Sequence, residues 1–178
     1  MTRFKFNGIN HLALVCADMD VTVDFYTNVL GMKLTKTIIL PGGQGKHFFF
    51  DAGNGDALAF FWFPDGPQSV DTEEFARITA TPGTMNHVAF DVPPESIDDY
   101  REQLVSNGVR VSEVVNHADT ESGVADTNDD TVFVRSLYFR DPDGVQLEFA
   151  AWTRDLNQND VDYEPPGNAA ADETPVRG

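Results

Sequence analysis

The sequence predicts an α+β fold made of two tandem βαβββ modules. Two segments, beginning at Gly8 and at Thr84, share one order of residues: small, apolar, Asn, His, apolar, Ala and apolar. Their histidines, His11 and His87, occupy the same position in that order. Each segment is followed by a helical pattern that ends at a glycine, and the two histidine-to-glycine distances differ by a single residue. This agreement indicates an internal duplication, with each copy forming one supersecondary unit.

The first module is expected at residues 7–63. Its histidine segment is dominated by apolar residues, which is typical of a strand. Asp18 is a suitable N-cap for a helix whose apolar residues repeat at helical spacing and which stops at Gly31. Three further strands are expected after that glycine, at residues 33–40, 47–50 and 57–63.

The second module is expected at residues 84–152. Its helix carries apolar residues from Ile97 to Leu104 and stops at Gly108. His117 falls in the long polar stretch 116–130, which we expect to be a loop. Strands are expected at residues 109–115, 132–139 and 145–152.

Two segments lie outside the modules. Residues 64–83 contain prolines and glycines around a short helical stretch, which predicts a linker. Residues 153–178 are rich in Asp, Asn, Pro and Ala and have few large apolar residues, which predicts a poorly ordered tail.

Composition excludes several classes of function. The 178 residues include 29 acidic and 12 basic side chains, a formal charge of −17, which disfavours nucleic acid as a partner. The apolar runs are strand-length, and neither a membrane span nor a secretory signal is expected. The single cysteine, Cys16, cannot form an intrachain disulfide, so a cytoplasmic location is expected.

Three residues predict a metal site. His11 and His87 lie on the first strand of each module, and Glu148 lies on the last strand of the second. A carboxylate between Leu147 and Phe149 is costly to bury without a partner. Two imidazoles and one carboxylate form a facial triad, which favours Fe(II), while Mn(II), Ni(II), Co(II) and Zn(II) are compatible. The structural alternative is a pair of hydrogen-bonded strand histidines with an outward-facing Glu148.

The chain resembles the vicinal oxygen chelate superfamily. The resemblance covers about residues 7–152 and rests on the paired modules, the Asn-His strand starts and the run Ser136–Glu148, which contains Tyr-x-x-Asp-Pro-x-Gly-x-x-x-Glu. This group contains glyoxalase I, fosfomycin-resistance proteins, bleomycin-binding proteins and type I extradiol dioxygenases. The resemblance implies an open, barrel-like metal-binding cleft, with Tyr138 as a catalytic residue.

Two positions help to choose among these relatives. In glyoxalase I the last strand of the first module supplies another ligand, but here the equivalent residue is Ala59 or Phe60, and neither binds a metal. The extradiol signature is matched by Leu137 and Tyr138, yet it also places a histidine upstream, where this chain has the stretch 129–131. Asp130, His117 or no residue is left as the general base.

The favoured function is an extradiol-dioxygenase-like oxygenase that acts on an aromatic vicinal diol or enediol. One alternative is a lyase, isomerase or epimerase that stabilises an enediolate on the metal. A second alternative is a protein that binds, or confers resistance to, a small molecule such as an antibiotic. The expected partner is an aromatic or apolar small molecule. The two modules can form one cleft within a chain or exchange with a second chain, and a homodimer is compatible with both arrangements.

Overall fold

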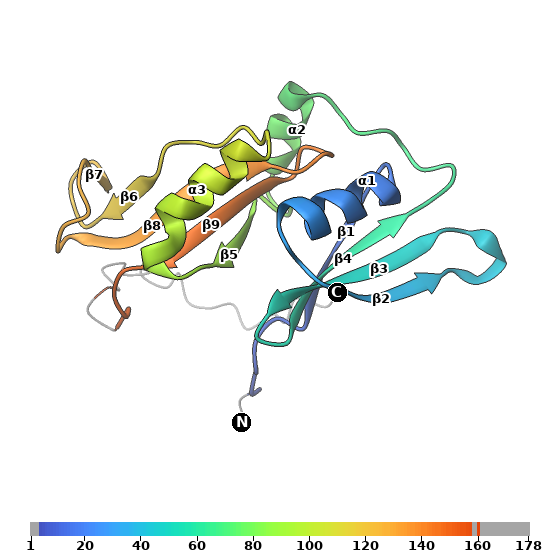
Figure 1. Ribbon diagram of the computed structural model, residues 1–178, viewed down its shortest axis with the longest axis horizontal. Helices are drawn as coiled ribbons and strands as arrows, with labels where there is room; N and C mark the ends of the chain where they lie inside the picture. The colour runs from blue at the N-terminus through green and yellow to red at the C-terminus, as the bar shows by residue number, and fades with distance from the viewer. Residues whose placement is uncertain (1–3, 158–159, 161–178) are drawn as a thin grey trace, which may run out of the picture.

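The computed structural model describes residues 4–157 and 160, and it contains two β-sheets with few helices. The first sheet has the order β1-β4-β3-β2 and the second has the order β5-β9-β8-β6-β7. The α+β class predicted from the repeat is confirmed, and the sheets do not close into a barrel, in agreement with an open arrangement (Figure 1). The strands are β1 (His11–Val15), β2 (Leu34–Ile39), β3 (Lys46–Gly53), β4 (Asp56–Trp62), β5 (Val88–Asp91), β6 (Val115–Ala118), β7 (Val124–Ala125), β8 (Val132–Arg140) and β9 (Gln146–Trp152).

The two sheets repeat one pairing scheme. β1 runs parallel to β4, and β5 runs parallel to β9, whereas the other neighbours are antiparallel. A crossover helix after the first strand of each sheet allows that parallel return. β1 and β5 are both edge strands, so the start of each duplicated unit lies at an open sheet edge.

Both crossover helices begin and end as their sequences dictate. The Asp18 side chain accepts hydrogen bonds from the N–H groups of Asp20 and Val21 and caps α1 (Met19–Asp24). A π-helical turn, η1 (Phe25–Val29), continues α1, and Gly31, with φ of 73°, ends it. The second crossover helix, α3 (Ile97–Ser106), follows the short 3₁₀ turn η3 (Pro94–Ser96).

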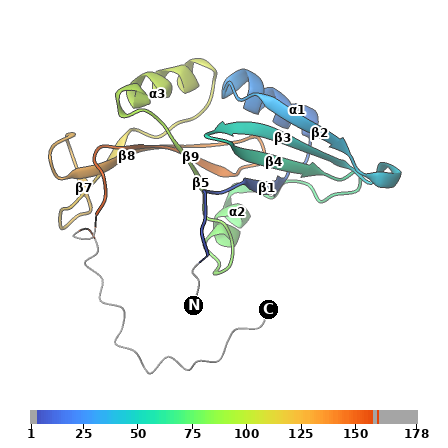
Figure 2. The ribbon, with the colours of Figure 1, turned by 90° about the horizontal axis from the view of Figure 1, so that it is seen from below.

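The helices divide the molecule into two faces. α1 and α3 lie on one face of the sheets, and Figure 2 shows that the opposite face is left open except around α2 (Thr72–Thr79). The Arg140 guanidinium lies 5.7 Å from the centre of the Phe75 ring, which places α2 near the β8–β9 turn. We call the side that faces away from α1 and α3 the open face.

A single core joins the two sheets on the helix side. Tyr26, fully buried on the helix of the first unit, donates a 3.1 Å hydrogen bond to Asp141 in the β8–β9 turn of the second. The Ala17 N–H, which precedes α1, donates to the Asp143 carboxylate in the same β8–β9 turn. Burial raises the pKa of Asp141 to about 6. The relative placement of the sheets therefore depends on the contacts that Ala17 and η1 make with that turn.

The strand predicted at 109–115 is wrong. Only Val111 forms an isolated bridge there, to Phe139, and strand β6 begins at Val115. The ladder changes at Ser112, whose hydroxyl oxygen replaces a carbonyl as the acceptor for the Tyr138 N–H. The Ser112 carbonyl instead accepts from the Arg101 side chain. As a result, the strand that pairs with β8 begins at Val115 and not at residue 109.

The loop predicted at 116–130 is also corrected, because β6 and β7 form a hairpin there and His117 lies in β6. Between β2 and β3 the chain makes the 3₁₀ turn η2 (Pro41–Gly43). The predicted tail at 153–178 lies outside the described residues except for 153–157 and 160. Across the part of the chain that is described, no helix is long and apolar enough to cross a bilayer.

Candidate metal centre

His87 and Glu148 form a close pair on the open face of the second sheet. His87 immediately precedes β5, and Glu148 lies in β9 opposite Ala89 of β5. His87 Nε2 and Glu148 Oε2 are 2.9 Å apart. The Glu148 side chain is 8% exposed, so burial of its carboxylate is costly unless a cation or a hydrogen-bond donor faces it.

Both strand-start histidines are oriented by the asparagine that precedes them. Asn86 Oδ1 lies 2.8 Å from His87 Nδ1, and Asn10 Oδ1 lies 2.8 Å from His11 Nδ1. An amide oxygen only accepts, so each Nδ1 carries a proton and donates it. The Nε2 lone pair is then left for a metal, and at His87 it faces the Glu148 carboxylate. Two acceptors 2.9 Å apart need a proton or a metal ion between them, so the donor set fits a divalent cation.

His11 does not join this pair within one chain. It lies on β1 in the first sheet, where its exposed ring is edge-on to Phe49 with centroids 5.6 Å apart. Among residues 4–157 and 160, no group of three or more His, Cys, Asp or Glu side chains is placed to hold a metal ion. The structure thus brings together two of the three predicted ligands and leaves the third on the other sheet.

The position of a fourth ligand is occupied by Ala59. In the first sheet Ala59 pairs with Ala13, two residues after His11, as Glu148 pairs with Ala89, two residues after His87. Ala59 is therefore the equivalent of Glu148 on the open face, whereas Phe60 points into the core against Tyr26. An alanine provides no donor atom.

Tyr138 lies beside the pair. It is the strand partner of Glu148 in the β8–β9 ladder, and its ring centre is 6.1 Å from that of His87. Directly opposed residues of an antiparallel pair point to the same side of a sheet, so Tyr138 is on the open face. Partial burial and the nearby Glu148 carboxylate raise the pKa of the Tyr138 phenol.

Two polar residues of this face were missed by sequence reasoning or left open. His117 Nε2 is 3.2 Å from the Tyr138 hydroxyl. Ser136, two residues before Tyr138, is fully buried, and its hydroxyl has no hydrogen-bond partner among the described residues. The alternation of Ser136 and Tyr138 along β8 could have indicated Ser136, but the position of His117 depends on the displaced strand β6.

The stretch that replaces the extradiol histidine lies away from this cluster. Asp129 accepts hydrogen bonds from the Thr131 N–H and hydroxyl, and the hydroxyl bond lowers the pKa of Asp129. Asp130 is exposed in the loop before β8. Cys16 is buried, and burial raises the pKa of its thiol, which is typical of an unreactive core cysteine.

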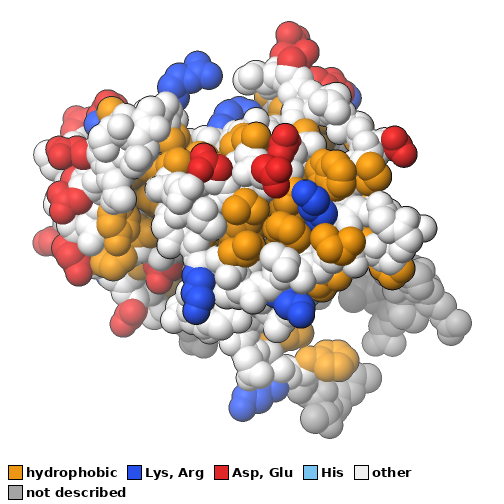
Figure 3. Space-filling model, turned by 45° about the vertical axis from the view of Figure 1, so that its right-hand side comes forward, with side chains coloured by type: hydrophobic (Ala, Val, Ile, Leu, Met, Phe, Trp, Pro, Cys, Tyr) orange, Lys and Arg blue, Asp and Glu red, His pale blue; other side chains and the backbone are white. Residues whose placement is uncertain are grey.

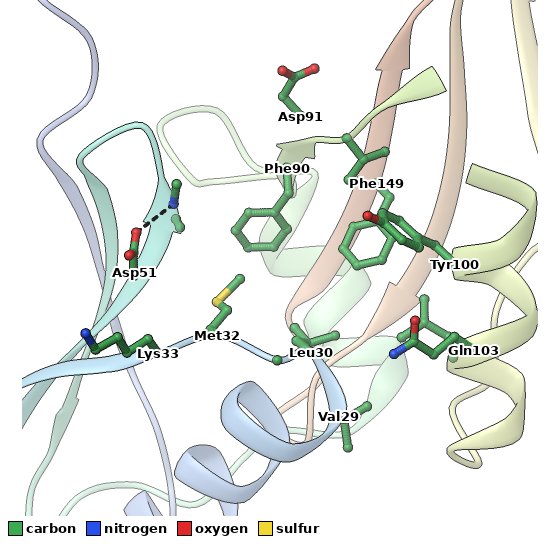
Figure 4. A pocket seen from close by; sticks show the side chains of 15 residues that line it. Val29, Leu30, Met32, Lys33, Asp51, Phe90, Asp91, Tyr100, Gln103 and Phe149 are labelled. Atoms are coloured by element: carbon green, nitrogen blue, oxygen red, sulfur yellow. Dashed lines mark hydrogen bonds between the residues drawn. The ribbon is translucent and has the colours of Figure 1, made fainter. Parts of the chain in front are cut away.

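A cavity of about 570 Å³ lies on the other side of the sheets, between the two units. Phe90, Tyr100 and Phe149 project into it, as Figure 4 shows. Phe149 follows Glu148 in β9, and neighbouring residues of a strand face opposite sides. The cavity is therefore separate from the His87–Glu148 pair.

On the face drawn in Figure 3, hydrophobic side chains gather across the middle, while Lys and Arg side chains stand singly.

Comparisons with known proteins show the family to which the chain belongs. The family model described as the Glyoxalase/Bleomycin resistance protein/Dioxygenase superfamily matches residues 8–149, so the chain belongs to that superfamily. The resemblance to vicinal oxygen chelate proteins is thereby confirmed.

Three relatives illustrate the range of the superfamily. MhqE of Bacillus subtilis (strain 168), named as a ring-cleaving dioxygenase, is 30% identical over 113 residues, which are 61% of this chain and 34% of MhqE. The chain thus spans about a third of that relative. Metallothiol transferase FosB of Shouchella clausii is 28% identical over 142 residues, 80% of this chain and 78% of FosB. A mutant of the fosfomycin resistance protein FosX from Listeria monocytogenes, solved with Mn(II) and 1S,2S-dihydroxypropylphosphonic acid, superposes with a TM-score of 0.54 at 22% identity, covering 84% of this chain and 93% of FosX.

Proposed function

We propose that this chain is a divalent-metal-dependent oxygenase of the extradiol type, acting on an aromatic vicinal diol or enediol. The observation that carries the proposal is the buried Glu148 carboxylate opposite His87 Nε2, with His87 Nδ1 tied to Asn86. His87, Glu148 and His11 would hold one metal ion, with Fe(II) favoured by this ligand set. When bound, the metal supplies a Lewis acid and a template for substrate and dioxygen.

A second copy of the chain would supply His11. β1 and β5 are edge strands of different sheets, and a two-fold dimer can place β1 of one chain beside β5 of its partner twice. Apolar side chains on the open face would be covered by such a partner: Val15 is 55% exposed and Trp152 is 49% exposed. Each dimer would then contain two complete sites.

The substrate would be apolar or aromatic. His47 stacks on Phe61 with ring centroids 3.6 Å apart, and Phe49 lies edge-on to both His47 and His11. These rings line the open face of the first sheet beside His11. They form an apolar wall against which an aromatic ring can pack.

A phosphonate is less well accommodated. Among the described strand residues of the open face, the cations are Lys36 and Arg140. The Arg140 guanidinium already donates to the Gly144 carbonyl and lies over Phe75. Recognition of a doubly charged phosphonate calls for several such donors, so a resistance activity like that of the FosB relatives is the second candidate. It is favoured by the greater coverage of FosB.

Oxygen uptake separates these functions. The protein is loaded anaerobically with Fe(II) and offered catechols that bear apolar substituents, with Glu148→Gln as the inactive control. Ring cleavage breaks one carbon–carbon bond of the diol ring and places both atoms of dioxygen in the product, so oxygen and diol disappear in equal amounts. Turnover under nitrogen at the aerobic rate would instead establish an enediolate lyase, isomerase or epimerase. Mn(II)-dependent thiol addition to fosfomycin would establish the resistance activity.

A further inference from the structure

The open face of the second sheet carries polar groups that metal binding does not use. His117 of β6 and Ser136 and Tyr138 of β8 all point to the same side as Glu148. The registers fix this, because His117 pairs with Val134, two residues before Ser136, and Tyr138 pairs with Glu148. The three side chains therefore form one row beside the carboxylate.

A hydrogen bond connects this row. His117 Nε2 lies 3.2 Å from the Tyr138 hydroxyl, and the imidazole is half-buried. The Ser136 hydroxyl is fully buried and has no partner among the described residues. A buried hydroxyl without a partner is costly, so its position indicates a place that a polar ligand atom completes.

Besides Ser136 and Glu148, which lie next to the Tyr138 hydroxyl on the same face, the other candidate polar residues do not reach it. The Asp129 carboxylate is engaged by Thr131, and Asp130 is exposed in the loop before β8. His47 stacks on Phe61 in the first sheet, where its Nδ1 is 3.1 Å from the Phe60 carbonyl oxygen. His117 is thus the imidazole that contacts the Tyr138 hydroxyl.

We propose that His117 is a positioning residue that donates its Nε2–H to the Tyr138 oxygen. The phenol proton is then directed away from His117, toward the space beside Glu148 where a substrate oxygen would bind. Tyr138 would donate to that oxygen, and the Ser136 hydroxyl would make a second hydrogen bond to the same ligand. This inference rests on the proposed function for the identity of the substrate, but the His117–Tyr138 contact itself does not.

The contact can be tested without turnover. In metal-free protein labelled with ¹⁵N-histidine, long-range ¹H–¹⁵N spectra recorded under alkaline conditions identify which ring nitrogen is protonated. We expect the proton of His117 on Nε2, and we expect Tyr138→Phe to shift the His117 Nε2 resonance but not those of His11 and His47. A His117 Nε2 that carries no proton, or that does not respond to Tyr138→Phe, would overturn the proposal.

Kinetics test the consequence. His117→Phe keeps a ring but removes the donor, and we expect kcat to fall about tenfold with a smaller change in KM, as for one lost hydrogen bond. His117→Gln restores an N–H at a similar reach and should recover kcat to within about twofold of the wild type. In a Tyr138→Phe background, His117→Phe should have no further effect. The matched control is Val124→Ala, the exposed strand partner of His117 in the same hairpin, which should leave kcat unchanged.

The outcomes separate two failures. If the wild type does not consume oxygen with any diol, the proposed function fails, and the spectra alone decide the His117–Tyr138 contact. The positioning role is wrong if the wild type turns over and His117→Phe leaves kcat unchanged. It is also wrong if His117→Phe lowers kcat as much in the Tyr138→Phe background as in the wild type.

Discussion

Tyr138 and Glu148 are direct partners in the β8–β9 ladder, and both face the open side of the sheet. In the proposed site the hydroxyl lies beside the carboxylate that would hold the metal, but it is not one of the three proposed ligands. This placement would separate the binding of metal from the handling of substrate.

We expect Tyr138→Phe to lower kcat by at least about tenfold, because the lost hydroxyl can no longer donate to a substrate oxygen. Metal content should stay near that of the wild type. Tyr100→Phe is the matched control, since Tyr100 contacts Phe149 on the helix side. Equal turnover in the wild type and Tyr138→Phe, measured by oxygen uptake, would mean that Tyr138 only packs.

Mixing two inactive chains tests whether the site lies between subunits. His11→Ala lacks one half of the site, and Glu148→Gln lacks the other. A random dimer mixture should regain about a quarter of the wild-type sites, because half of the dimers are mixed and each holds one intact site. Metal content and oxygen uptake are compared before and after denaturing, mixing and refolding. No recovery, with mixed dimers shown by mass spectrometry, would place all three ligands in one chain.

Asp141 makes stability depend on pH. Burial raises its pKa from 3.8 to about 6 in the folded chain, a difference equivalent to about 3 kcal/mol. A carboxyl group with a raised folded-state pKa contributes stability that is fully present below the unfolded pKa of 3.8 and is lost as pH rises through about 6.

We therefore expect the free energy of unfolding of the metal-free wild type, relative to Asp141→Asn, to fall by about 2 kcal/mol between about pH 4 and pH 7. Urea unfolding of both proteins across this range measures the difference. Parallel curves would show that Asp141 titrates with an ordinary pKa in the folded chain.

Much of the fold was predictable because the chain repeats itself. The Asn-His segments mark the starts of both units. Asp18, which predicts the start of the first helix, also caps that helix in the structure. The failure at 109–115 has a local cause. Val109 and Val111 alternate as in a strand, but the Ser112 hydroxyl and the Arg101 side chain take over hydrogen bonds that a continuous ladder would make.

The candidate site was predictable only in part. Glu148 is predicted as a site residue because it interrupts an apolar strand, and the structure places it against His87. The separation of His11 from this pair could not be read from spacing. It depends on how the two units pack, which is set by long-range contacts such as that between Tyr26 and Asp141.

The most direct test is the metal content of the purified protein and of three variants, His11→Ala, His87→Ala and Glu148→Gln. We expect one divalent ion per chain in the wild type and loss of that ion in each variant, with the circular dichroism spectrum unchanged. Glu102→Gln, an exposed carboxylate on α3, serves as the control and should retain its metal. Full metal occupancy in all three variants would contradict the assignment of this face as a metal centre.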